Sequence, residues 1–154
     1  MQLRRLLSQP ARLEVLENGP MISTELAATL RDAGLVWTPA DGDQFRVQAP
    51  ELTSDVFTVS TMTIEAHEYP TGTILGFNGT TEWALDSVAI EDALWLPRED
   101  QLRVLLRSSF QALRRTDGAY EVEVELLGQT RVFAEPQPDE AYGRALLALI
   151  ELSR

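Results

Sequence analysis

The order of apolar and polar residues along the chain predicts three amphipathic helices. Apolar side chains recur there at spacings of three and four residues, which places them on one face of a helix. The first helix begins after an N-cap at Ser23 or Thr24 and stops at Gly34. The second covers residues 97–115, and the third begins at residue 139. The expected buried stripes are Leu26, Ala27, Leu30 and Ala33 in the first, Leu102, Leu105, Leu106, Phe110 and Leu113 in the second, and Ala141, Ala145, Leu146, Leu149 and Leu152 in the third.

Between the first two helices the pattern becomes typical of strands. A short strand is expected over residues 45–47. Residues 56–86 are rich in β-branched side chains and contain turn signals around Gly72 and at Asn78-Gly79, which predicts a meander of three strands, the first a single run up to Glu68. A two-residue turn at Asn78-Gly79 would place Ile74 opposite Trp83, so we expect that face to belong to the core.

The clearest strand covers residues 120–126, where two valines alternate with three glutamates. Gly128 ends this strand and opens a hairpin, whose register depends on the length of the turn. A two-residue turn would put Arg131 among the buried valines, and an odd turn would avoid this. We therefore expect a bulged or three-residue turn, with Arg131 opposite Glu123 or Glu125.

The order of these elements is helix, strands, helix, hairpin and helix, and the connections between strands are too short for parallel crossovers. This order predicts an α+β fold in which three helices cover one face of an antiparallel sheet of about five or six strands. The length of 154 residues suits one domain. Because Pro10 and Pro20 punctuate the start, we interpret residues 1–20 as an N-terminal extension and residues 21–154 as a single α+β domain.

Composition excludes several kinds of chemistry. The 13 basic residues are all arginine, and the chain has no cysteine. Schiff-base catalysis by lysine, the lysine of a phosphate-binding loop, disulfides and cysteine zinc sites are therefore excluded. The net charge of −11 repels phosphate backbones and anionic membrane faces, so we expect no nucleic-acid and no membrane partner. With no bilayer-length apolar run and no secretory signal, the predicted location is cytoplasmic.

Glu65, His67 and Glu68 form the strongest candidate for catalysis. Glu65 and His67 lie two residues apart on a predicted strand and so share a face, where a carboxylate can orient the imidazole as a general base or help to hold a metal. One histidine falls short of a catalytic zinc set, and a histidine on the outer face of a strand is commonly an ordinary polar residue. We therefore predict no cofactor and no resident metal.

Two other groups are candidates for binding. Carboxylates close to tryptophans, as between residues 82 and 95, are the residue types found in cation-binding and sugar-cleaving sites. The acids lack the regular spacing of a calcium loop, however. The simpler interpretation is that the tryptophans pack against the core and the acids lie in water. Three glutamates on one strand face form either a solvated face or an acidic stripe that docks a basic protein. The candidates are Glu82, Glu91 and Asp92, together with the predicted binding residues Trp83, Asp86, Trp95, Glu121, Glu123 and Glu125.

Three segments carry a resemblance to other proteins. GFNGTTEWALDS, ALWLPREDQL at a helix start and AYGRALLALI near the end resemble a group of small uncharacterised bacterial proteins from actinobacterial and related genomes, with shorter relatives of the second segment in phages. The resemblance covers residue 21 to the end and implies a shared fold unit. Some members carry a pilus-assembly label, but the ATPase that it implies needs a phosphate-loop lysine. No catalytic residue follows from the resemblance.

These observations together predict a non-enzymatic module that binds a basic protein partner or associates with itself as a homodimer. One alternative is a small metal-dependent or acid/base hydrolase that uses Glu65, His67 and Glu68, with Asp86 as a further group. Another alternative is an immunity or phage-related protein whose acidity neutralises a basic partner.

Overall fold

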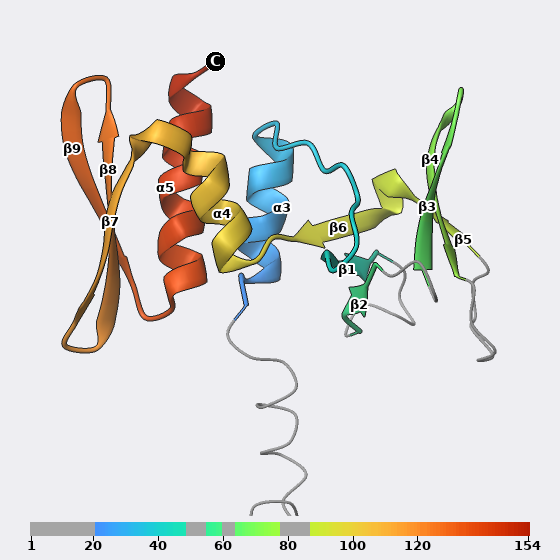
Figure 1. Ribbon diagram of the computed structural model, residues 1–154, viewed down its shortest axis with the longest axis horizontal. Helices are drawn as coiled ribbons and strands as arrows, with labels where there is room; N and C mark the ends of the chain where they lie inside the picture. The colour runs from blue at the N-terminus through green and yellow to red at the C-terminus, as the bar shows by residue number, and fades with distance from the viewer. Residues whose placement is uncertain (1–20, 49–54, 60–63, 78–86) are drawn as a thin grey trace, which may run out of the picture.

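The computed structural model describes residues 21–48, 55–59, 64–77 and 87–154. These residues form three α-helices and three antiparallel sheets of three strands each, arranged one behind the other along the longest axis of the molecule (Figure 1). The predicted α+β class with three helices is confirmed, whereas the single sheet of five or six strands is wrong. The predicted extension at 1–20 and the predicted turn at Asn78-Gly79 lie outside the described residues.

The first and third helices form where the sequence predicts them. Helix α3 spans Thr24–Asp32, and the Ser23 hydroxyl caps it by accepting a hydrogen bond from the Leu26 N–H at 3.3 Å. Helix α5 spans Pro138–Leu152 and has proline in its first turn, where a missing N–H does no harm. Both helices turn most of their predicted stripes towards the core, but Leu152 at the end of α5 is exposed.

Helices α3 and α5 lie side by side and run in the same direction (Figure 1). At one end the Ser23 N–H donates to the Glu140 carboxylate, and at the other the Arg154 guanidinium donates to a carbonyl oxygen beyond the end of α3 at 2.6 Å. Between these ends Gly143 lets the helices approach, because a Cβ there would lie 2.6 Å from Cδ2 of Leu26.

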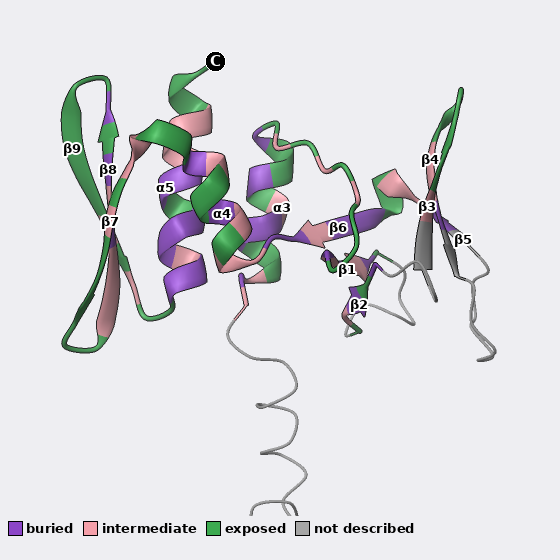
Figure 2. Ribbon diagram, in the orientation of Figure 1, coloured by how far each residue is buried: buried purple, intermediate pink, exposed green. Residues whose placement is uncertain are grey.

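One face of α5 covers a sheet with the order β7-β8-β9. The strands span Phe110–Thr116 (β7), Ala119–Leu126 (β8) and Gln129–Glu135 (β9). The helices, the inner face of β8 and two residues of β6 (Ala93–Leu96) enclose the larger core. Figure 2 shows its buried stretches on the three helices. Its fully buried side chains include Ile22, Leu26, Leu30, Leu94, Leu96, Leu102, Leu106, Val122, Val124 and Tyr142.

The second predicted helix is only half correct. Helix α4 spans Glu99–Leu106 and is followed by a 3₁₀ turn, η2, at Arg107–Ser109, where Arg107 has a φ of 53°. The chain then continues as β7, which pairs with β8. A bulge after Phe110 shifts the alternation by one residue, so Phe110 and Leu113 face the same side although they are three residues apart. This spacing imitates a helical period, which is why the pattern misled the prediction.

The predicted odd turn between β8 and β9 is also wrong. Leu127 and Gly128 form a two-residue turn with φ of 51° and 74°, both in the left-handed region that such a turn requires. Arg131 consequently lies opposite Val124 and not opposite Glu123 or Glu125. Arg131 therefore shares the core-facing side of the sheet with Val124. Because Arg131 lies on an edge strand and is exposed, its guanidinium still remains in water.

A second core lies between the other two sheets. One of these sheets has the strand order β2-β1-β6, with β1 at Gln44–Val47 as predicted and β2 at Phe57–Thr58. The other sheet has the strand order β3-β4-β5. The strands of the latter span Ile64–Tyr69 (β3), Gly72–Phe77 (β4) and Ser87–Ala89 (β5), and η1 (Ile90–Asp92) leads into β6. The core consists of Phe45, Val47, Phe57, Val59, Leu75, Val88 and Ala93.

The predicted meander needs two corrections. The run that begins at residue 56 is divided, because β2 pairs with β1 whereas β3 pairs with β4. Ile74 lies opposite Ala89 and not opposite Trp83, and the neighbouring Leu75 is fully buried. The core face of β4 is therefore the opposite of the one predicted.

Strand β6 has no counterpart among the predicted elements. Leu94 and Leu96 belong to the larger core and Ala93 to the second, so the strand is covered on both faces. A strand buried on both sides reads as a continuous apolar run and loses the period-two signal. Within the described residues, no helix is long and apolar enough to cross a membrane.

Candidate functional site

A cavity of about 600 Å³ opens between α3, the segment after it and the β6 strand. Apolar and aromatic side chains form its walls, and charged side chains lie at its rim. Cavities of this size and composition are typical of sites that receive a small molecule or part of a partner. We call it the tryptophan pocket, and its lining residues are Ala27, Arg31, Asp32, Leu35, Val36, Trp37, Gln48, Ile90, Glu91, Ala93, Leu94 and Trp95.

Two stacked indoles make up one wall of the tryptophan pocket. The rings of Trp37 and Trp95 lie 6.3 Å apart between centroids and are nearly parallel, at 8°. Trp37 also packs against the buried ring of Phe45 at 5.5 Å, which connects the wall with the second core. Aromatic groups of this kind present a large contact area with little rotamer entropy to lose on binding.

A buried carboxylate holds Trp37 in place. Asp43 accepts hydrogen bonds from the Trp37 indole N–H at 2.9 Å, from the Ala40 backbone N–H at 3.0 Å and from the Gln101 amide at 2.6 Å. The Arg98 guanidinium lies 3.7 Å from the same carboxylate. These contacts connect the segment before β1 to the start of α4, so the pocket wall rests on two elements far apart in the sequence.

Trp95 differs from Trp37 in its polar group. Its Nε1 is buried, and no acceptor in the described part of the chain bonds to it. An unpaired buried N–H typically destabilises a protein by about 1–3 kcal/mol.

The rim of the tryptophan pocket carries more negative than positive charge. Arg31 lies 3.1 Å from Asp32, so these two charges balance, and the exposed Glu91 adds a carboxylate. Val36 lies at the same rim with 80% of its surface exposed. An apolar cavity with an acidic rim suits an apolar group that has a cation beside it.

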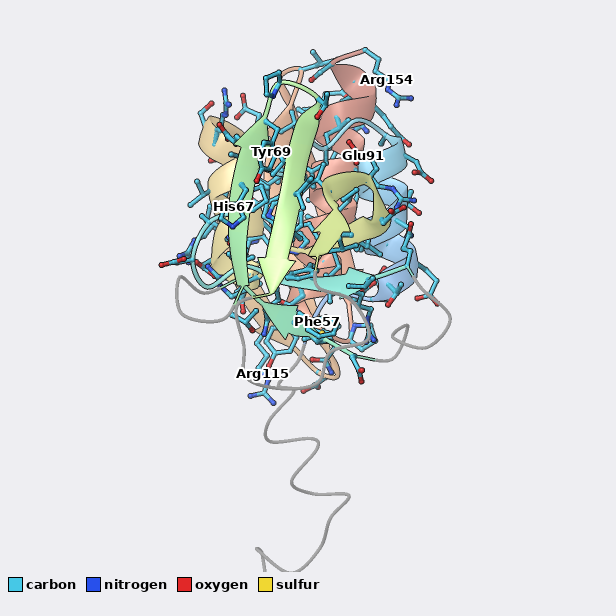
Figure 3. The ribbon with its side chains drawn as sticks, turned by 90° about the vertical axis from the view of Figure 1, so that its right-hand side faces the viewer. Phe57, His67, Tyr69, Glu91, Arg115 and Arg154 are labelled. Carbon is cyan, nitrogen blue, oxygen red and sulfur yellow. The ribbon has the colours of Figure 1, made fainter. Side chains whose placement is uncertain are left out.

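The catalytic candidates lie on β3, in the sheet at the end of the molecule (Figure 3). His67 and Glu68 are exposed and, as neighbours on a strand, point to opposite faces. Glu65 shares the His67 face in the backbone, but its side chain lies outside the described residues. Figure 3 shows His67 and Glu91 on the two sides of β4, and His67 does not line the tryptophan pocket. In the described part of the chain, no three His, Cys, Asp or Glu side chains form a metal-binding group.

The predicted binding residues are distributed over two places. Trp95 lies in the wall of the tryptophan pocket, whereas Trp83 and Asp86 lie outside the described residues. Glu121, Glu123 and Glu125 share the outer face of β8, as the alternation predicts. Arg114 from β7 bonds to Glu123 and lies opposite Glu121, which neutralises part of this stripe.

A further titratable group, Asp139, was not anticipated from the sequence. It lies at the start of α5 and is almost fully buried. Burial, followed by the nearby charges of Glu99 and Glu140, raises the pKa of Asp139 to about 6. It does not line the tryptophan pocket, so we expect Asp139 to affect stability and not binding there.

We expect Asp139→Asn to change how stability depends on pH. The ordinary pKa of an aspartate, 3.8, applies to the unfolded chain, so the folded protein holds the Asp139 proton more tightly than the unfolded chain does. The protonated carboxyl therefore stabilises the fold at low pH, and this contribution to the free energy of unfolding is lost as pH rises from about 4 to about 6. Relative to the variant, the parent protein should lose up to about 3 kcal/mol over this range. Urea unfolding of both proteins at pH 4.5 and 7.5, followed by tryptophan fluorescence, measures the difference.

Glu99→Gln serves as the control for the cause of this shift. Without the Glu99 charge the pKa of Asp139 moves down, so the pH-dependent loss should shrink but remain, because burial is the largest cause. An equal stability difference between the parent and Asp139→Asn at both pH values would contradict the assignment.

No protein-family model, curated protein sequence or solved structure matches the chain. The resemblance to the bacterial group therefore stays a prediction. The sequence reasoning singled out Trp95 but missed Trp37, Val36 and Asp43. A signal was present, since Leu35-Val36-Trp37 is an apolar run between a helix stop and a turn, where burial against a neighbouring element is common.

Proposed function

We propose that the protein is a non-catalytic binding module, and that its tryptophan pocket receives an apolar side chain from a basic protein partner. The observation that carries this proposal is the pair of stacked indoles, Trp37 and Trp95, in the wall of an apolar cavity of about 600 Å³. Tryptophan side chains near the centre of an interface contribute much of the binding free energy in many protein complexes.

Charge supports a basic partner. The chain carries a net charge of −11, and the pocket rim has Glu91 in addition to the balanced Arg31 and Asp32 pair. Opposite charges around an apolar anchor accelerate the encounter and disfavour acidic competitors. The ligand chemistry is therefore an extended peptide segment with an apolar residue beside arginine or lysine.

A selection with random peptides displayed on phage tests this chemistry. The enriched peptides should pair a large apolar residue with a neighbouring arginine or lysine, and a synthetic copy should shift the Trp95 indole resonance in an NMR titration. The Trp37 indole resonance should move less than that of Trp95, because the Trp37 N–H is already bonded to Asp43. Enrichment of acidic peptides, or no enrichment over an unrelated protein, would overturn the proposal.

Two exposed valines provide a matched pair of variants. Val36→Arg places a long cationic side chain at the pocket rim, so the affinity for the selected peptide should fall by about tenfold or more. Val104→Arg makes the same change on the exposed face of α4, outside the pocket lining, and should leave the affinity within about twofold. Neither valine is buried, so both variants should fold. Equal affinities of the two variants would place the peptide elsewhere.

A further inference from the structure

The β9 strand offers a free edge at the end of the molecule farthest from β3 (Figure 1). In the order β7-β8-β9 it pairs with β8, and no other described strand pairs with it. A groove of about 350 Å³ runs between this edge and α5, lined among others by Val132, Phe133, Ala134, Arg144, Leu147 and Ala148. An edge of seven residues with half its backbone groups unpaired is a template for a further strand.

The hairpin geometry determines which backbone groups point outwards. In a two-residue hairpin the residues that flank the turn, here Leu126 and Gln129, form a hydrogen-bonded pair. Antiparallel strands then alternate, so Thr130, Val132 and Ala134 direct their N–H and C=O groups away from β8. An added antiparallel strand therefore bonds to these three residues.

We propose that two copies of the chain associate through β9, antiparallel about a two-fold axis at Phe133, and so join their sheets into one of six strands. In this register Arg131 of each copy lies opposite Glu135 of the other, and Val132 lies opposite Ala134. The strand is thus complementary to itself in charge, and the two pairs of Val132 and Ala134 exchange both of their backbone hydrogen bonds. This inference goes beyond the proposed function, because it concerns another surface and another partner.

The side chains on the inner face support the same register. Phe133 is half-buried under α5, and a two-fold axis there brings the two phenyl rings together in a pair where side chains approach closely. Glu135 already lies 3.5 Å from Arg144 of its own chain. Arg131 of the second copy gives this carboxylate a second cation. Leu147 and Ala148 of both α5 helices then cover the joined strands from one side.

Other symmetric pairings are less favourable. A two-fold axis at Val132 would place Arg131 opposite Phe133 of the second copy and leave both Glu135 side chains without a cross-strand cation. An axis at Arg131 would bring two arginines together. The β7 edge contains a bulge after Phe110 and the adjacent Arg114 and Arg115, so it lacks both a regular ladder and opposite charges.

Sedimentation velocity at increasing protein concentration tests the dimer. The parent chain should approach twice the mass of one chain. Arg131→Glu should weaken association by about tenfold or more, because two pairs of carboxylates then face each other across the axis. Glu135→Arg should weaken it equally through two pairs of guanidiniums. Arg115→Glu, on the opposite edge of the same sheet, is the control and should leave the dimer intact.

Mixing the two self-repelling variants gives the decisive measurement. One chain then carries acids at 131 and 135 and the other carries arginines, so all pairs are complementary and a heterodimer should form with parent-like affinity. Circular dichroism confirms that each variant is folded before mixing. A monomeric parent at all concentrations, a dimer that persists in Arg131→Glu, or folded variants that stay monomeric when mixed would each overturn the proposal. Failure here would leave the peptide result at the tryptophan pocket unaffected, because β9 does not line that pocket.

Discussion

Replacing Asp43 by alanine should lower the free energy of unfolding by about 3–5 kcal/mol. Asp43 is 3% exposed and accepts three hydrogen bonds, so its removal leaves the partly buried donors of Trp37, Ala40 and Gln101 without this acceptor. The nearby Arg98 guanidinium loses its contact as well. Urea unfolding followed by tryptophan fluorescence measures the loss, and the Trp37 indole resonance should change its position in the NMR spectrum.

Asp41→Ala is the matched control for this effect. Asp41 lies in the same turn and is exposed, so the free energy of unfolding should change by no more than about 0.5 kcal/mol. Asp43→Asn should fall between the two, because an amide keeps one accepting oxygen but presents an NH₂ group to the other donors. A loss below about 1 kcal/mol in Asp43→Ala would contradict a supporting role for this carboxylate.

Phe45→Ala should also destabilise the protein by about 3–5 kcal/mol. Its ring is completely buried in the second core and packs between Trp37, at 5.5 Å, and Phe57, at 5.6 Å. Truncation leaves a cavity beneath the tryptophan wall. Because β6 contributes side chains to both cores, we expect one unfolding transition and not two. Calorimetry and fluorescence should give the same midpoint.

Phe45→Leu separates loss of volume from loss of the ring. Leucine fills most of the space, so the loss should stay below about 1.5 kcal/mol. A Phe45→Ala protein within about 1 kcal/mol of the parent would show that this ring is not part of a packed core. Two separate transitions would show that the cores unfold independently and that β6 does not couple them.

The candidate site was predictable only in part. Trp95 was named from the sequence because a tryptophan beside acids and turns is typical of a binding surface. Trp37 and Asp43 were not, because their roles depend on contacts with residues up to 58 positions away, such as the bond from Gln101 to Asp43. In the sequence, a single aspartate before a strand is typical of a turn. Only the burial of Asp43 and the three hydrogen bonds that it accepts show that it supports the pocket.

Local patterns determined the elements whose faces are simple. Ser23 and Gly34 bound α3, the alternation in 120–126 predicted β8, and the apolar stripe of α5 predicted its buried side, since each signal lies within a few residues. The absence of lysine and cysteine and the charge of −11 likewise belong to the sequence alone. These features were sufficient for the α+β class and for three helices.

Tertiary structure decided the rest. The bulge in β7 and the two-residue turn at Leu127 and Gly128 belong to hairpins of neighbouring strands, where the pairing register decides between several possible turns. The burial of β6 on both faces results from packing against distant segments. The division into three sheets follows from the same cause, because β1 finds its partners in β2 and β6 and not in the meander. Strand pairing and core packing contribute more free energy than the helix and strand propensities of a short segment. Where the two disagree, the pairing determines the structure.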